Sequence, residues 1–287
     1  MDFLRPTTWA EALAAKADRP EAVPLQGGTD VMVEINFAVR RPPALLDLTR
    51  VAELRAWSVA DGVCRIGAGV PYRVVVEELG ALAPGLAQAA RTVGSPQIRN
   101  RGTVGGNLGA ASPAGDSHPP LLAAEAVVEA ESRDGGVRLI PAAGFYRGVK
   151  RSALRPDELI RAVRVPVAAG PQYFSKVGTR NAMVIAVCSF AIALDPARQR
   201  IGTGIGSAAP TPRRAEAAEE LLARELDWDA AAPDASLVKR FGRLCAEAAA
   251  PIDDVRGTAA YRLHAVEIMA RRTLTWAWSD HIGRRAA

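Results

Sequence analysis

Gln26-Gly27-Gly28-Thr29-Asp30 is the first of two glycine-rich stretches that decide the fold, and Arg99-Asn100-Arg101-Gly102-Thr103-Val104-Gly105-Gly106-Asn107 is the second. We expect each to lie where a strand gives way to a loop or a helix. Adjacent glycines let the backbone adopt positive φ and approach a ligand closely, so that successive N–H groups point at an anion. Thr29, Thr103 and Asn107 add short polar groups. Together the two segments predict a clasp around one phosphate-bearing cofactor.

The composition of the 287-residue chain is typical of a globular protein with two or three domains. Its formal charge of +5 comes from Arg and Lys scattered among many Asp and Glu. Because nucleic-acid-binding proteins usually gather their basic residues on one face, this scatter argues against nucleic acid as a partner. Neither an N-terminal signal peptide nor a run of roughly 20 apolar residues is visible. We therefore expect a cytoplasmic protein without a membrane span.

The cysteines and histidines predict no metal site. Cys64, Cys188 and Cys245 are odd in number and far apart, which favours neither a disulfide framework nor an iron–sulfur centre on this chain. The three histidines lack the spacing of zinc ligands.

The N-terminal half alternates helix and strand signals, which predicts α/β layers. Thr8-Trp9-Ala10-Glu11 fits a capping box ahead of a short helix that ends near Ala17. The other elements expected here are strands at residues 22–25, 44–48, 63–66, 127–131, 137–140 and 159–165, and helices at residues 72–79, 85–93 and 119–124.

Val167-Ala168-Ala169-Gly170-Pro171 marks a predicted domain boundary, because small residues and two flanking prolines interrupt regular structure there. Beyond it, β-branched and alternating apolar residues predict antiparallel strands, and the composition then becomes helical. The strands are expected at residues 173–177, 184–194 and 200–207, and the helices from Thr211-Pro212 to about residue 226, at 236–250 and at 258–278.

Four further motifs follow the glycine-rich segments in order along the chain. They are Ala111-Ser112-Pro113-Ala114-Gly115-Asp116, Lys176-Val177-Gly178-Thr179-Arg180 with Ile185-Ala186, Ala209-Pro210-Thr211-Pro212, and Pro251-Ile252-Asp253-Asp254-Val255-Arg256-Gly257. With Gln97-Ile98 ahead of the second glycine-rich segment, the set resembles the FAD-binding, medium-sized subunit of the molybdenum hydroxylases. That family includes xanthine dehydrogenase and aerobic carbon monoxide dehydrogenase. Six ordered motifs are far more specific than a single glycine pattern.

The resemblance implies an α+β fold. Two α/β FAD-binding subdomains of the PCMH type would be followed by a C-terminal domain of antiparallel sheet and helical bundle. The FAD-binding domain would span residues 1–167, with subdomains at about 1–55 and 56–167. The C-terminal domain, of the carbon monoxide dehydrogenase flavoprotein type, would span residues 168–287.

The same resemblance implies the contacts of the FAD. They involve Leu25, Gln26, Gly27, Gly28, Thr29, Asp30 and Val31, then Thr103, Val104, Gly105, Gly106 and Asn107, and finally Ser112, Asp116, Ile160 and Lys176. The backbone of the two glycine-rich segments would grip the pyrophosphate, and Asp116 would bond toward the ribose or adenine end. Ile160 and Lys176 would lie near the flavin, where a lysine could stabilise negative charge on the reduced ring. No catalytic residue is implied on this chain.

Two positions depart from the family pattern. Many members have Ala at the position of Gln26 and Asp at the position of Val184. Neither change removes a glycine. The change at Gln26 concerns the side-chain packing at the loop entrance, and the change at Val184 concerns a polar contact in the second domain.

The function implied by the resemblance is that of an electron-transfer flavoprotein subunit. Electrons would leave an organic substrate at the molybdenum cofactor of a large partner and cross 2Fe-2S clusters on a small partner. They would then reach the FAD of this chain and pass to an external acceptor such as NAD. The sequence looks closest to bacterial xanthine dehydrogenase flavin subunits, which implies purine oxidation by a heterotrimer that forms dimers.

Two alternative functions stay open. The chain could be a self-contained PCMH-type flavin oxidoreductase that uses its second domain as a substrate lid. It could also be a non-catalytic docking subunit that has lost FAD, although the intact glycines of both segments argue against this.

Three other patterns are better explained by structure than by chemistry. Asp253-Asp254 and Arg256 precede a helix, which predicts a cap and an ion pair rather than an acid/base pair. Gly202-Thr203-Gly204-Ile205-Gly206 lacks Gly-x-Gly-x-x-Gly spacing and is interpreted as a glycine-bearing strand end. Gly67-Ala68-Gly69 also lacks Gly-x-Gly-x-x-Gly spacing and is not interpreted as a nucleotide-binding loop.

Overall fold

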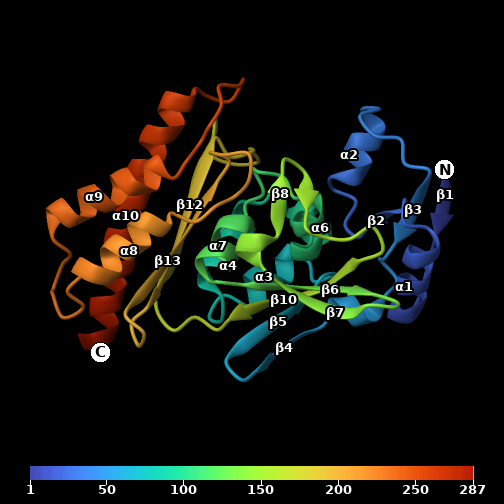
Figure 1. Ribbon diagram of the computed structural model, residues 1–287, viewed down its shortest axis with the longest axis horizontal. Helices are drawn as coiled ribbons and strands as arrows, with labels where there is room; N and C mark the ends of the chain where they lie inside the picture. The colour runs from blue at the N-terminus through green and yellow to red at the C-terminus, as the bar shows by residue number, and fades with distance from the viewer. Residues whose placement is uncertain (287) are drawn as a thin grey trace.

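Residues 2–47 contain a small parallel sheet with strand order β1-β3-β2 (Figure 1). The computed structural model describes residues 1–286. In the sheet, β1 spans Asp2–Leu4, β2 Val23–Leu25 and β3 Ala44–Asp47. Helix α1 (Trp9–Asp18) joins β1 to β2, and the predicted capping box between Thr8 and Glu11 is confirmed. Strand β2 leads directly into the first glycine-rich segment.

A five-stranded antiparallel sheet, with order β4-β5-β10-β6-β7, forms the centre of the molecule. Its strands are β4 Trp57–Ala60, β5 Val63–Gly67, β6 Val127–Ser132, β7 Gly136–Pro141 and β10 Leu159–Pro166. Between β5 and β6 the chain forms helices α3 Tyr72–Glu78, α4 Pro84–Thr92, α5 Pro96–Arg101, α6 Val104–Ala110 and α7 His118–Ala123. Figure 1 places α3, α4, α6 and α7 on one side of this sheet. The second glycine-rich segment lies among these helices.

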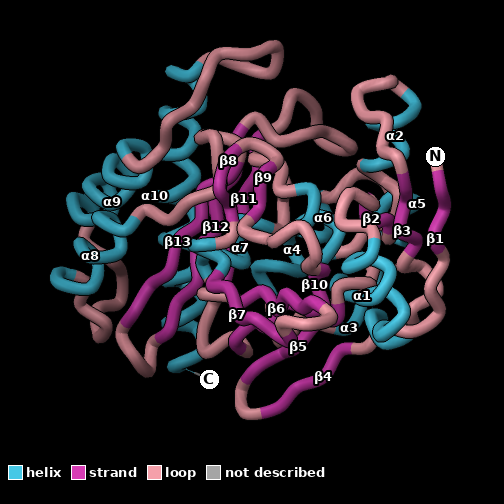
Figure 2. Tube along the Cα trace, turned by 45° about the vertical axis from the view of Figure 1, so that its right-hand side comes forward, coloured by secondary structure: helices cyan, strands magenta, loops and turns pink. Residues whose placement is uncertain are grey.

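The C-terminal part is a three-stranded antiparallel sheet covered by helices. Its strands are β11 Gln172–Val177, β12 Cys188–Asp195 and β13 Arg200–Gly206, and its helices are α8 Glu216–Glu225, α9 Ala235–Glu247 and α10 Ala259–Ala286. Helices α4 and α7 contact this sheet from the side of the five-stranded sheet (Figures 1 and 2). Gly202 and Gly204 permit this approach, because a Cβ on either would lie within 2.1 Å of a carbonyl oxygen of the segment around α7.

Two large hydrophobic cores hold these parts together. The first includes Leu46, Ile66 and Phe145 and lies around the two N-terminal sheets. The second includes Phe190 and Trp278 and lies between the C-terminal sheet and its helices. The predicted α+β fold is therefore confirmed.

The prediction of a strand before the second glycine-rich segment was wrong. Helix α5 occupies that place, because Ser95 accepts a hydrogen bond from the Ile98 amide and Pro96 fills the first helical position. The segment then opens helix α6 at Val104. The first segment likewise enters a short helix, α2 (Val31–Asn36).

Three element boundaries in the C-terminal part differ from the prediction by four residues or more. The helix expected at residues 258–278 continues to Ala286. The strand expected from Val184 begins only at Cys188, since residues 183–185 line a cavity instead. The helix expected from Thr211 begins at Glu216. Arg213 is held out of that helix because its backbone amide and carbonyl both bond Ile205 of β13.

The remaining elements are short. They are the 3₁₀ helices Ala52–Arg55 and Ala142–Gly144 and the strand pair β8 Tyr146–Gly148 with β9 Arg151–Ser152. The predicted cap and ion pair before the last helix are both present: Asp253 accepts from the Ala259 amide, and Asp254 binds Arg256. Within residues 1–286, no helix has the length and apolarity needed to cross a membrane.

Candidate cofactor site

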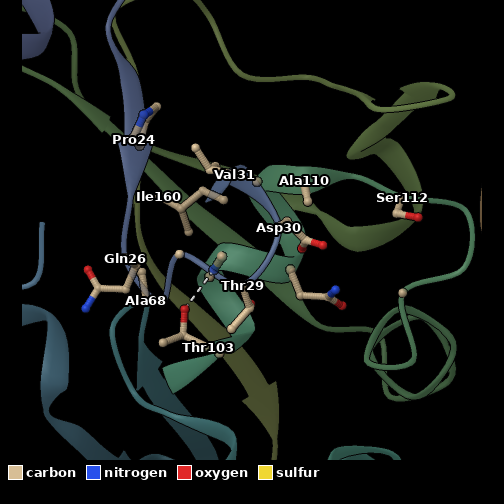
Figure 3. A pocket seen from close by; sticks show the side chains of 18 of the residues that line it. Pro24, Gln26, Thr29, Asp30, Val31, Ala68, Thr103, Ala110, Ser112 and Ile160 are labelled. Atoms are coloured by element: carbon tan, nitrogen blue, oxygen red, sulfur yellow. Dashed lines mark hydrogen bonds between the residues drawn. The ribbon is translucent and has the colours of Figure 1, made fainter. Parts of the chain in front are cut away.

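A cavity of about 640 Å³ brings the two glycine-rich segments together. Its walls come from β2 and α2, from α5 and α6, from the loop before α7, from β10, and from residues 183–185 of the C-terminal part. Figure 3 shows Thr29 of the first segment beside Thr103 of the second, and Val31, the first residue of α2, near Ile160. Cavities of this size hold small molecules and organic cofactors.

The first glycine-rich segment turns the chain from β2 into α2. Gly28 has a φ of +74°, a region that favours glycine. Among the described residues, the backbone N–H groups of Gly28, Thr29, Asp30 and Val31 donate to no acceptor. The segment therefore presents several free donors beside the cavity.

The second segment forms the first turn of α6. Thr103 caps this helix, and its Oγ1 accepts from the Gly106 amide at 2.9 Å. The amide of Gly105 precedes this capped donor and, within residues 1–286, has no acceptor. Both glycine-rich segments thus contribute free N–H groups to one region, which suits an anion.

Asp116 contributes a buried carboxylate to the cavity wall. Its Oδ2 accepts from Lys176 Nζ at 2.5 Å and lies 3.0 Å from Thr92 Oγ1. Burial raises the pKa of Asp116, while the ammonium of Lys176 and the hydroxyl of Thr92 counteract this rise. Oδ1 is buried and has no hydrogen-bond partner in the described part of the chain. Because such an oxygen is costly to leave unpaired, the site fits a ligand that carries a hydroxyl donor.

A buried polar network supports the loop before α7. Ser117 Oγ donates to Asn107 Oδ1 at 2.6 Å, and Tyr72 Oη donates to Ser117 Oγ at 3.3 Å. His118 is fully buried, and its Nδ1 lies 2.9 Å from Tyr146 Oη. Burial lowers the pKa of His118 to about 3. His118 is therefore a neutral part of the scaffold that carries Asp116.

Most residues predicted to contact the cofactor line this cavity. They are Gln26, Gly27, Gly28, Thr29, Asp30, Val31, Thr103, Gly105, Gly106, Asn107, Ser112, Asp116 and Ile160. Ile160 reaches the cavity from β10, where the register shifts between Ile160 and Ala162. Their contacts with a cofactor stay predictions.

Leu25, Val104 and Lys176 were also predicted to contact the cofactor, but they do not line the cavity. Leu25 pairs with Asp47 in the parallel sheet, and Val104 is fully buried in the first core. Lys176 lies behind Asp116, where its ammonium also donates to the Thr92 carbonyl at 3.3 Å.

Sequence reasoning missed a second group of cavity residues. The group comes from α1, α2 and the segment around β9, and includes Lys16, Glu34, Lys150, Leu154 and Arg155. Lys150 and Glu34 form an ion pair of 2.5 Å, while Lys16 donates to the Pro20 and Ala22 carbonyls. These residues belong to no local motif, so that only the tertiary structure identifies them.

The comparison with known families decides the identity of the site. Residues 1–168 match the family described as FAD binding domain in molybdopterin dehydrogenase. The chain is a FAD-binding subunit of the molybdenum hydroxylase family. Residues 173–277 match the family described as CO dehydrogenase flavoprotein C-terminal domain. The resemblance inferred from the six motifs is therefore confirmed.

Individual relatives of this molybdenum hydroxylase subunit match most of the chain. The xanthine dehydrogenase FAD-binding subunit of Escherichia coli O157:H7 is 31% identical over 283 residues, which are 95% of this chain and 94% of that protein. The caffeine dehydrogenase subunit beta of Pseudomonas sp. strain CBB1 is 32% identical over 231 residues, 77% of each protein. A chain of the carbon monoxide dehydrogenase structure from Hydrogenophaga pseudoflava superposes with a TM-score of 0.88 at 27% identity, covering 97% of this chain and 98% of that one.

Proposed function

We propose that this subunit binds FAD in the 640 Å³ cavity and relays electrons from partner chains to an external acceptor. One observation carries the binding part of the proposal: free N–H groups of both glycine-rich segments border the same cavity as Asp116, whose buried Oδ1 has no partner among the described residues. Fixed amide dipoles suit a pyrophosphate, and a carboxylate oxygen suits a sugar hydroxyl.

Each group of cavity residues has a distinct task in this proposal. The amides of residues 28–31 and of Gly105 bind the pyrophosphate, and Asp116 accepts a hydroxyl at the ribose or adenine end. Ile160, which is 8% exposed, packs an apolar side chain near the flavin and excludes water there. FAD supplies the redox chemistry when bound, and the protein supplies binding and orientation. No residue of this chain needs to act as an acid or a base.

The proposal extends to the wider assembly. We propose a large molybdopterin-binding partner and a small 2Fe-2S partner, arranged as a dimer of heterotrimers in the cytoplasm, with NAD as the external acceptor. Xanthine and caffeine, which appear in the names of two relatives, are both purines. This shared chemistry supports a purine as the substrate oxidised by the complex.

FAD binding is tested by titrating the purified, flavin-free chain with FAD and following flavin fluorescence. We expect one FAD per chain and the absorbance bands of a bound oxidised flavin. A chain that takes up no FAD, alone or with its partners, would instead support the docking subunit.

The assembly and substrate are tested by purifying the native complex and measuring NAD reduction with xanthine, caffeine, nicotinate or carbon monoxide. We expect turnover with xanthine only when all three chains are present. Turnover of any substrate by this chain alone would favour the self-contained flavin oxidoreductase. Preference of the complex for carbon monoxide or nicotinate would overturn the purine assignment but leave the FAD site intact.

A further inference from the structure

The ion pair between Lys176 and Asp116 joins two separate parts of the fold. Lys176 lies on β11 of the C-terminal sheet, whereas Asp116 lies in the loop between α6 and α7. Their side chains are 9% and 7% exposed, so that both charges are nearly removed from water. Charges buried this far are stable only when they are paired and hydrogen-bonded.

The two oxygens of Asp116 face different surroundings. Oδ2 is occupied by Lys176 at 2.5 Å and approached by Thr92 at 3.0 Å, while Oδ1 has no partner among residues 1–286. Lys176 does not line the cavity, but Asp116 does. The bonds to Oδ2 therefore fix the rotation of the carboxylate and leave Oδ1 as the acceptor available to a ligand.

The electrostatics also favour an indirect role for Lys176. Its ammonium is neutralised by a carboxylate 2.5 Å away and donates a further hydrogen bond to the Thr92 carbonyl. A paired charge exerts a much weaker field on a flavin than a free ammonium does. With its charge paired in this way, Lys176 does not stabilise a reduced flavin directly.

We propose that Lys176 is a positioning residue, which acts on cofactor binding through Asp116 and makes that binding depend on the docking of β11 against the FAD-binding domain. This inference rests on the proposed function, because it takes FAD as the occupant of the cavity. It assigns to the C-terminal domain a part in cofactor retention.

The test is a double-mutant cycle on the affinity for FAD, measured by fluorescence titration of the full chain. The four proteins are wild type, Lys176→Met, Asp116→Asn and the double variant. We expect each single variant to weaken FAD binding about tenfold, the loss typical of a hydrogen bond to a charged group. We expect the double variant to bind no more weakly than Asp116→Asn, because the effect of Lys176 disappears once Asp116 cannot pair with it.

The flavin midpoint potential provides a second readout that a structural defect would not imitate. Lys176→Met should leave the potential of bound FAD unchanged in the Asp116→Asn background. The proposal would be overturned if the fold-loss in FAD affinity of the double variant equalled the product of the two single losses. It would also be overturned if Lys176→Met shifted the flavin midpoint potential in both backgrounds. Either result would indicate direct contact of Lys176 with the flavin.

Two controls separate this inference from misfolding and from failure of the proposed function. Lys239→Met replaces an exposed lysine of α9 and should bind FAD like wild type. If Lys176→Met does not fold, Lys176→Gln completes the same cycle. If the wild-type chain does not bind FAD, the proposed function itself is contradicted. If the wild-type chain binds FAD but the affinity losses of the two single variants multiply in the double variant, only the role of Lys176 is contradicted.

Discussion

Gly27 lies directly against the backbone of Arg101: a Cβ on Gly27 would stand 2.3 Å from the Arg101 carbonyl oxygen. The two glycine-rich segments therefore touch each other through their backbones. A similar restriction holds at Gly105, whose Cβ would lie 2.5 Å from Ala68 Cβ. Gly106 differs, since the nearest atom to its Cβ would be Thr103 Oγ1 at 3.1 Å. Gly27 and Gly105 thus serve packing against backbone within the protein, while a methyl group at Gly106 would make one tight contact, with a side-chain hydroxyl that can shift slightly.

This difference predicts opposite outcomes for two alanine substitutions. Gly27→Ala must displace the backbone of Arg101, so we expect a loss of about 2 kcal/mol of unfolding free energy together with weak FAD binding. Gly106→Ala should keep the stability of the flavin-free chain but weaken FAD binding at least about tenfold, because the methyl group occupies space next to the pyrophosphate. Urea unfolding and FAD titration measure the two effects separately. Wild-type affinity in Gly106→Ala would show that the pyrophosphate does not approach this turn.

His118 predicts a pH dependence of stability. Its pKa is lowered from 6.5 to about 3 in the folded protein, so between these values the unfolded chain binds a proton that the folded chain does not. The stabilisation from neutral His118 is complete above pH 6.5 and is lost as the pH falls toward 3. The loss approaches about 1.4 kcal/mol per pH unit. The unfolding free energy, measured with urea between pH 4 and 7.5, should depend less steeply on pH for His118→Asn than for wild type.

Tyr146→Phe is the matched control for this prediction. It removes the hydroxyl 2.9 Å from His118 Nδ1 but keeps the buried imidazole. We expect Tyr146→Phe to lower the unfolding free energy by about 1 kcal/mol at pH 7, and below pH 6.5 its unfolding free energy should depend on pH as steeply as that of wild type. Equal slopes for wild type and His118→Asn would mean that His118 becomes protonated without unfolding.

Local signals explain why much of the fold could be predicted from the sequence. The capping box at Thr8 and Glu11 involves residues three apart, and the strands of the central sheet follow runs of β-branched residues. The glycine-rich segments identified the cavity, because free amides and positive φ are local properties of the backbone.

The remainder could not be predicted because it depends on contacts distant in sequence. Lys176 of β11 pairs with Asp116 in the loop between α6 and α7, 60 residues away, and nothing near Lys176 distinguishes it from an exposed lysine. Helix α2 has no buried side chain, so no amphipathic pattern marks it. The start of α8 is delayed by the bridge from Arg213 to Ile205, which a pattern of helix formers does not reveal.

The pair of Lys150 and Glu34 predicts a modest effect on cofactor release. Since α2 has no buried side chains, this 2.5 Å ion pair is one of its few attachments at the cavity rim. Lys150 is 54% exposed, so that the pair contributes less than about 1 kcal/mol. We expect Lys150→Met to speed FAD release about threefold at low salt and less at high salt, by stopped-flow fluorescence. A rate equal to that of Lys239→Met at all salt concentrations would show that α2 does not retain the cofactor.

Glu129 on β6 predicts a stability effect that is independent of the cofactor. Its carboxylate is 2% exposed and accepts two-pronged hydrogen bonds from Arg65 of β5, as well as one from Arg164 of β10. Burial opposes the ionisation of Glu129, yet the two guanidinium groups lower its pKa below 4.5. The stabilisation is therefore present above pH 4.5 and is lost as the pH falls through the lowered pKa of the folded protein.

Glu129→Gln should lower the unfolding free energy by about 2 kcal/mol at pH 7, because it leaves two guanidinium groups without a countercharge. Thermal or urea unfolding measures this loss, which should shrink as the pH is lowered below 4.5. Arg164→Gln is the matched control: Arg164 is 44% exposed, and its removal leaves the Arg65 contact in place, so we expect a loss below about 1 kcal/mol. Equal losses for the two variants would mean that Arg164, rather than the paired contact with Arg65, holds the three strands together.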